Sequence, residues 1–171
     1  HRFSDLETFK RFEPEGNISK RLYKISEKIR CEKIGTSYFR GVKNNIETYY
    51  QERVSGLDLK SSEDRIIESF ENYLRTKFLD FRDNSQIEKK LKSYKKDLND
   101  KFKDKINKLN DFTLDQAKFN SLISELIANM NLDEKLDEEE KKDDEKNNDD
   151  KQNKPDNQEK QAKEKEDKQE E

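Results

Sequence analysis

The chain has 171 residues, of which 45% are charged, and its net charge is −3. It contains no run of 18 apolar residues, so we expect no membrane span. A single cysteine, Cys31, and a single histidine exclude an internal disulfide and a transition-metal site of the usual ligand spacing. This cysteine usage fits a reducing cytoplasm, and we predict a cytoplasmic protein.

The composition changes sharply at residue 133. Between residues 133 and 171 only Leu136 and Ala162 are apolar, and 18 acidic residues stand against 10 basic ones. That segment carries −8, which leaves +5 for residues 1–132. So few apolar side chains cannot offset the entropy cost of ordering the chain. We therefore predict a folded domain over residues 1–132 and a disordered acidic tail over residues 133–171.

Apolar residues recur at helical spacing through the first part of the folded domain. The pattern predicts one or two helical turns within residues 3–12, followed by a break at residues 13–16, which contain a proline and a glycine. It then predicts a helix over residues 17–34 and a shorter one over residues 42–54.

The next segments also favour helices. After a loop through residues 55–60, Ser61-x-x-Asp64 resembles a capping box, and it precedes a broad apolar face that continues to Phe78. From Ile87 to Leu109 apolar residues recur every three or four positions for more than six turns, which is typical of one helix of a bundle or of an antiparallel pair of helices.

Thr113-x-x-Gln116 has the pattern of a capping box and predicts the start of a last helix that ends near Met130. No segment sustains the period-two alternation of a β-strand. The fold class predicted from these patterns is all-α: a small bundle of about four to five helices followed by the disordered acidic tail.

Most catalytic signatures are absent from the sequence. There is no Gly-x-x-x-x-Gly-Lys-Ser/Thr phosphate loop, and Gly35-Thr-Ser lacks both the lysine and a preceding strand. We therefore predict no catalytic residue, no metal ligand and no bound cofactor in this chain. Residues 89–108 hold nine lysines that could bind nucleic acid, but the interleaved acidic residues favour a solvated helix face. Tyr49 and Tyr50 could form a binding platform, although aromatic residues on an amphipathic helix more often join the core.

Glu27, Arg30 and Glu32 form a distinctive charged group on the helix predicted over residues 17–34. Glu27 and Arg30 are three residues apart and therefore neighbours on the helix surface, whereas Glu32 points away from them. Arg30 adjoins Ile29 at the edge of the apolar face, where a guanidinium needs a carboxylate partner. Two interpretations stay open: a structural ion pair, which we favour, or a docking site for a partner.

The same region resembles the N-terminal region of the T-type subunit (CobT) of the aerobic, ATP-dependent cobaltochelatase. That family has a Pro-Glu-Gly just before a helix reading roughly Glu-Gln-x-Arg-x-Glu-Ala-Leu-Gly, and then Gly-Val-Ala-x-Asn-Leu. The matching residues here are Pro14, Glu15, Gly16, Glu27, Arg30, Glu32, Gly35, Gly41, Val42, Asn45 and Ile46. This chain departs from the pattern at Lys28, which stands where the family has Gln, and at Lys33, which stands where it has Ala.

The resemblance implies a place in an assembly. In that family the subunit joins an AAA+ ATPase, the S-type subunit, in a hetero-oligomeric ring complex with a large catalytic subunit. The complex uses ATP with magnesium to insert cobalt into hydrogenobyrinic acid a,c-diamide during cobalamin biosynthesis. We expect the helical domain to dock on the ATPase ring and the acidic tail to lead to the family's von Willebrand A-type domain, which lies outside this chain.

Other interpretations keep the helical domain but give it a different function. It could be an adaptor of a MoxR-like AAA+ ATPase that acts without cobalt, or an unrelated helical interaction or surface protein. A nucleic-acid binder ranks below both, because the lysines are interleaved with acidic residues.

Overall fold

The computed structural model describes residues 3–39 and 41–138. Within these ranges the chain is helical and has no strand, which confirms the all-α fold class. Residues His1–Leu136 form one compact unit, and a second unit, Asp137–Glu171, falls almost wholly outside the described residues. Residues 133–138, which the sequence assigned to the disordered tail, are helical, and the rest of the predicted tail, from residue 139 onward, lies outside the described residues.

Eight α-helices and one short 3-10 helix, η1, lie wholly within the described residues, and residues 132–138 are also helical. In chain order they are α1 (Leu6–Arg11), α2 (Asn17–Tyr38), α3 (Val42–Ser55), α4 (Ser62–Lys77), α5 (Ser85–Lys90), η1 (Lys92–Tyr94), α6 (Lys95–Phe102), α7 (Ile106–Asp111) and α8 (Gln116–Ala128).

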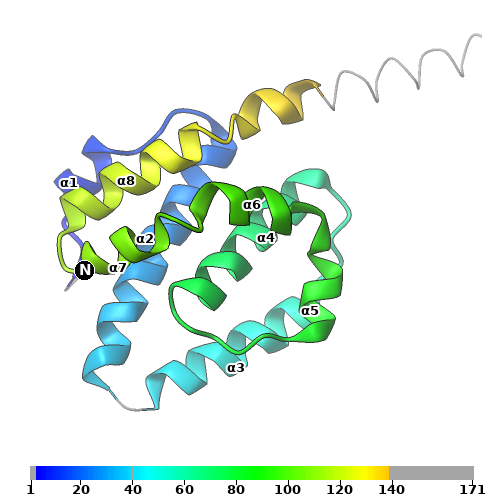
Figure 1. Ribbon diagram of the computed structural model, residues 1–171, viewed down its shortest axis with the longest axis horizontal. Helices are drawn as coiled ribbons and strands as arrows, with labels where there is room; N and C mark the ends of the chain where they lie inside the picture. The colour runs from blue at the N-terminus through cyan, green and yellow to red at the C-terminus, as the bar shows by residue number, and fades with distance from the viewer. Residues whose placement is uncertain (1–2, 40, 139–171) are drawn as a thin grey trace, which may run out of the picture. The chain divides into compact units, whose positions relative to one another are not determined.

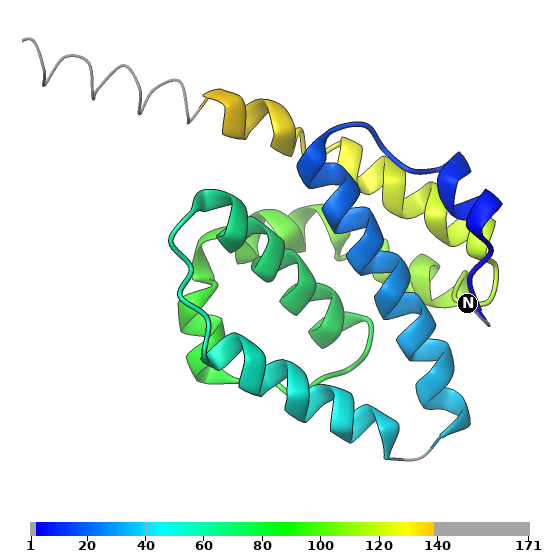
Figure 2. The ribbon, with the colours of Figure 1, turned by 180° about the vertical axis from the view of Figure 1, so that it is seen from behind.

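Helix α2 is the central element of the domain. It packs against α4 on one side and against α8 on the other, as Figures 1 and 2 show from opposite directions. Leu22, Tyr23 and Ile29 are fully buried. Leu22 and Ile29 lie on the apolar face that the sequence pattern predicted, and Tyr23 adds to it. The core continues into Phe70 of α4 and Ile123 of α8, which are also fully buried.

Helix α2 runs four residues beyond its predicted end. Gly35 does not terminate it, and the hydroxyl groups of Thr36 and Ser37 donate to the carbonyls of Lys33 and Ile34, at 2.9 and 2.6 Å. These bonds lie within the last turn of the helix. The helix ends at Tyr38, and the next residue, Phe39, has an extended backbone conformation.

One predicted helix cap is confirmed and one is wrong. Ser61 accepts a hydrogen bond from the Asp64 N–H at 3.0 Å and caps α4 as expected. At α8 the cap is Asp115, which accepts from the Lys118 N–H at 3.1 Å. Thr113 instead turns back, and its hydroxyl donates to the carbonyl of Asn110 at 2.7 Å.

Of the two alternatives for residues 87–109, the single long helix is wrong, because the segment is divided into α5, η1, α6 and α7. Its apolar residues are nonetheless buried, since the breaks let the segment bend around α4. Two lysines of this segment bind carbonyls at the ends of other helices. Lys90 donates to the Val54 carbonyl at 3.1 Å, and Lys101 donates to the Asn129 carbonyl at 2.9 Å. Tertiary contacts here override a local preference for one helix.

The start of α2 is closed by a residue from the far end of the domain. The Asp133 carboxylate accepts from the N–H groups of Ile18 and Ser19, at 3.0 and 3.3 Å, and from the Ser19 hydroxyl at 2.5 Å. Asp133 therefore caps the N-terminus of α2 across the tertiary structure. Gly16 makes room for it: a Cβ there would lie 2.3 Å from Asp133 Oδ2, and Gly16 has φ of +91°.

We expect Gly16→Ala to lower the free energy of unfolding by about 1–3 kcal/mol, because alanine is strained at this φ and its Cβ displaces Asp133. Gly35→Ala is the matched control. Gly35 is helical, and a Cβ at this position would have no atom within 4 Å, so alanine should raise the free energy of unfolding by up to about 1 kcal/mol. Urea denaturation followed by circular dichroism measures both, and equal effects of the two substitutions would contradict the capping arrangement.

A buried amide in α8 is left without partners. Asn120 is 1% exposed, and neither its Nδ2 nor its Oδ1 has a hydrogen bond within the described residues. Burying such a group costs about 1–3 kcal/mol.

We therefore expect Asn120→Leu, which has nearly the same shape, to raise the free energy of unfolding by about 1–3 kcal/mol. Asn107→Leu serves as a control, because Asn107 is exposed and its replacement should change stability by less than about 0.5 kcal/mol. Thermal unfolding of the two variants provides the comparison. A destabilised Asn120→Leu would show that the amide has a role the fold requires.

Candidate functional site

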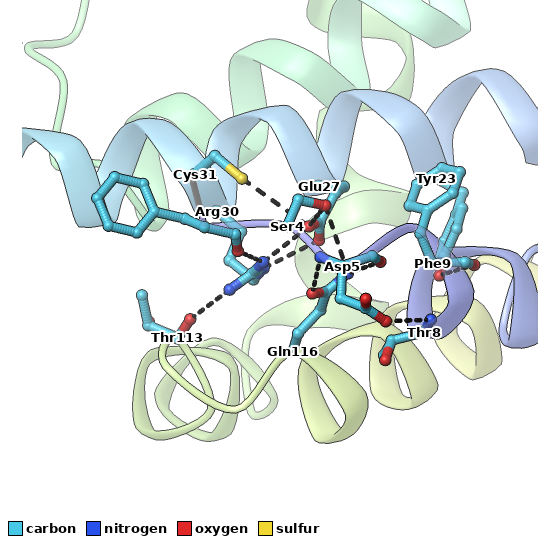
Figure 3. A network of polar contacts seen from close by, with 11 residues as sticks. Ser4, Asp5, Thr8, Phe9, Tyr23, Glu27, Arg30, Cys31, Thr113 and Gln116 are labelled. Carbon is cyan, nitrogen blue, oxygen red and sulfur yellow. Dashed lines mark hydrogen bonds and ion pairs between the residues drawn. The ribbon is translucent and has the colours of Figure 1, made fainter. Parts of the chain in front are cut away.

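Glu27 and Arg30 form an ion pair inside the domain. Both project from α2, and their side chains are only 8% and 1% exposed. Arg30 donates from Nε to Glu27 Oε2 at 2.9 Å and from Nη2 to Glu27 Oε1 at 2.7 Å, so the contact is bidentate (Figure 3). A partner protein cannot reach this pair without opening the domain.

The remaining contacts of the pair join two distant segments to α2. Arg30 donates to the Phe3 carbonyl at 2.5 Å and to the Thr113 carbonyl at 2.9 Å, while the Ser4 hydroxyl donates to Glu27 at 2.6 Å. Burial lowers the pKa of Arg30, but its hydrogen bond to Glu27 and the charge of Glu27 outweigh burial and raise it. The guanidinium therefore stays charged and holds these segments in place.

Two neighbouring residues complete this network in Figure 3. Gln116, which was expected to take part in the α8 cap, instead binds the backbone of Asp5. Its side chain accepts from the Asp5 N–H at 2.7 Å and donates to the Asp5 carbonyl at 2.9 Å. The Cys31 thiol lies 3.8 Å from Glu27 Oε1. Burial and the charge of Glu27 raise the pKa of Cys31, so it remains a thiol rather than a nucleophilic thiolate.

Glu32 belongs to a second network, on the side of α2 that faces α4. Its Oε2 accepts from Arg75 Nη1 at 2.6 Å, and Arg75 Nε donates to Glu71 at 2.8 Å. Arg53 of α3 continues the series, donating to Glu71 at 3.0 Å and to Glu68 at 2.8 Å. The structure thus separates Glu32 from Glu27 and Arg30, and positive and negative side chains alternate between three helices.

Tyr50 lies against both arginines of this network. Its ring centroid is 4.8 Å from the Arg75 guanidinium carbon and 5.4 Å from that of Arg53. Burial, together with the charges of Glu71 and Glu68, raises the pKa of Tyr50. Tyr50 is thus a core residue, as expected, whereas Tyr49 is 67% exposed and the prediction that it joins the core is wrong.

A pocket of about 270 Å³ opens between α2, α3 and α4, above these charges. Its lining residues are Lys28, Glu32, Asn45, Ile46, Tyr49, Tyr50, Arg53, Glu71 and Arg75. The floor consists of the paired charges, and Lys28 and Tyr49 are largely exposed. This pocket is the candidate binding site of the domain.

The other positions of the sequence motif have separate places. Gly41 precedes α3 with φ of +90°, a conformation that favours glycine, and Val42 is the first residue of that helix. Gly35 lies within α2. Asn45 and Ile46 line the pocket together with Glu32, so three motif positions meet at one site.

Sequence reasoning missed several buried polar residues. Among the residues that join Glu32 in the second network, only the Glu71–Arg75 pair, four residues apart on α4, had a signal in the sequence. Glu47 is 3% exposed and accepts from the Arg82 N–H at 2.6 Å, which fixes the segment before α5. Nothing in the local sequence marks Glu47, because its partner lies 35 residues away.

Metal clusters and membrane-spanning helices are absent from the described residues. Across residues 3–39 and 41–138, no three His, Cys, Asp or Glu side chains are grouped so as to hold a metal ion. No helix in those ranges combines the length and the apolar character needed to cross a bilayer.

Together these features define an all-helical domain held together by buried ion pairs. A family model described as cobalamin biosynthesis protein CobT matches residues 1–171, and the chain belongs to this family. The resemblance drawn from the sequence motif is thereby confirmed, and family membership implies a role in cobalamin biosynthesis. Comparisons with curated proteins and with solved structures find no match.

We expect Arg30→Met to lower the free energy of unfolding by about 3–5 kcal/mol, because it leaves the Glu27 carboxylate buried without its cation. Replacing both residues by methionine should recover much of that loss, since no charge then remains to be buried. Urea denaturation measures the single and double variants.

Arg21→Met is the matched control for this prediction. Arg21 pairs with Glu63 from the surface of the same helix, with side chains 52% and 41% exposed, so its loss should cost less than about 1 kcal/mol. If Arg30→Met were as mild as Arg21→Met, the interior pair would not organise the domain.

Proposed function

We propose that the chain acts within the T-type subunit of an ATP-dependent cobaltochelatase. In this proposal the subunit works with an AAA+ ATPase and a large catalytic subunit to insert cobalt into hydrogenobyrinic acid a,c-diamide. The observation that carries the proposal is the match of the CobT family model to residues 1–171.

The domain contributes binding surface to that complex. ATP hydrolysis belongs to the ATPase, and cobalt is a substrate handled by the large subunit. Two features of the domain support such a role. First, buried ion pairs hold α2 against α4 and against the N-terminal segment. Second, the pocket is lined by three helices, α2, α3 and α4, whose relative positions are fixed by the ion pairs of Glu32, Arg75, Glu71 and Arg53.

The test is reconstitution with the full-length subunit and the two other proposed components. We expect ATP-dependent conversion of hydrogenobyrinic acid a,c-diamide to its cobalt complex, followed by absorbance, only when all three proteins are present. Mixtures that lack ATP, and mixtures that lack this subunit, are the controls.

Two results would contradict the proposal. Cobalt insertion at the same rate without this subunit would remove it from the reaction. Binding to the ATPase without cobalt insertion in the complete mixture would assign the subunit to another client of the ATPase.

A further inference from the structure

The rim of the pocket between α2, α3 and α4 carries hydrogen-bond donors that have no acceptor. The Lys28 ammonium is 3.9 Å from its nearest carboxylate, Glu32, which is too long for a hydrogen bond. Among the residues that the structure describes, the side chains of Asn45 and Tyr49 also make no hydrogen bond. The side chain of Arg53 is 31% exposed, and its two Nη atoms donate to Glu68 and Glu71, while its Nε–H makes no hydrogen bond within the described residues.

The acidic groups of the pocket are already occupied. Glu32 accepts from Arg75, and Glu71 accepts from both Arg75 and Arg53. A cation entering the pocket would have to compete with these arginines, whereas an anion would meet the Lys28 ammonium at the rim. The arrangement therefore favours a negatively charged group.

The size and the aromatic side of the pocket indicate what carries that charge. Its volume of about 270 Å³ lies at the lower end of the range of about 300–1,000 Å³ that small-molecule sites occupy, so the ligand group it accepts is small. The exposed ring of Tyr49 and the half-buried Ile46 lie on the same helix, three residues apart, and offer an apolar contact beside the charged groups. A pair of neighbouring protein side chains, one acidic and one apolar, suits this surface.

We propose that this pocket docks a partner protein through a segment that presents a carboxylate to Lys28 and Arg53 and an apolar side chain to Ile46 and Tyr49. The identification of that partner as a chelatase subunit rests on the proposed function. The chemistry that recognises the segment rests on the pocket alone.

The test uses the full 171-residue chain, labelled with ¹⁵N, and three blocked tetrapeptides: Glu-Leu-Glu-Leu, Gln-Leu-Gln-Leu and Lys-Leu-Lys-Leu. We expect the acidic peptide to shift the amide resonances of Lys28, Asn45 and Tyr49 and to bind at least about tenfold more tightly than the neutral one. Equal binding of the three peptides, shifts that map elsewhere, or no shifts would overturn the proposal.

Variants with matched controls sharpen the test. Lys28→Glu and Tyr49→Ala change side chains that are 63% and 67% exposed, so the fold should tolerate them, and each should weaken binding of the acidic peptide about tenfold. Lys20→Glu reverses an exposed charge on α2 outside the pocket, and Tyr38→Ala removes a ring that is 66% exposed elsewhere. Both controls should bind like the wild type, and loss of binding in the controls would overturn the proposal.

The same variants separate this inference from the proposed function. If the full-length subunit binds the ATPase or the large subunit and Lys28→Glu leaves that affinity unchanged, the docking proposal fails while the chelatase function stands. If it binds neither protein but still binds the acidic peptide at the pocket, the chelatase function fails and the pocket chemistry stands.

Discussion

The domain depends on one buried charge, the guanidinium of Arg30, which is 1% exposed. A cation so far from water must be paired and hydrogen-bonded, or the fold that buries it is unstable. Glu27 supplies the pairing, and the carbonyls of Phe3 and Thr113 supply further acceptors. The N-terminal segment and the connection between α7 and α8 are thus positioned by the needs of one side chain. These polar contacts add to the apolar packing of Phe9, Phe12 and Phe112 against the core.

The second network acts on the opposite side of α2 and has a different consequence. Glu32 joins α2 to α4 through Arg75, and Arg53 brings α3 into the same series of charges. Three helices therefore keep a fixed register around the pocket, and its rim is arranged before any partner arrives. Preorganisation of this kind lowers the entropy that binding would otherwise cost. Because the arginines occupy the acidic groups, only the donors at the rim remain available to a ligand.

Local sequence signals predicted the parts of the fold that depend on local interactions. The apolar periodicity located α2 and α3, and Ser61 marked the start of α4, because these features need only neighbours along one helix. The prediction failed where a distant partner decides the conformation. Lys90 binds a carbonyl at the end of α3, at the point where the expected long helix is interrupted. Asp133 caps a helix that begins more than a hundred residues earlier. Of the candidate site, Glu32, Asn45 and Ile46 came from the motif, but their convergence with Arg53 and Arg75 is a tertiary property.

The two networks use the same residue types for opposite purposes, and burial decides which. The charges of Glu27 and Arg30 are buried, so they form hydrogen bonds only within the domain and a partner cannot reach them. At the pocket, the paired charges lie beneath an open rim where Lys28 and Tyr49 reach solvent. A binding surface in a chain that is 45% charged cannot be recognised by charge alone, since nearly every helix presents it. We infer the surface instead from hydrogen-bond donors at the pocket rim, such as Lys28, that have no acceptor. The neighbouring carboxylates, Glu32 and Glu71, already accept from Arg75 and Arg53 and hold the three helices in place.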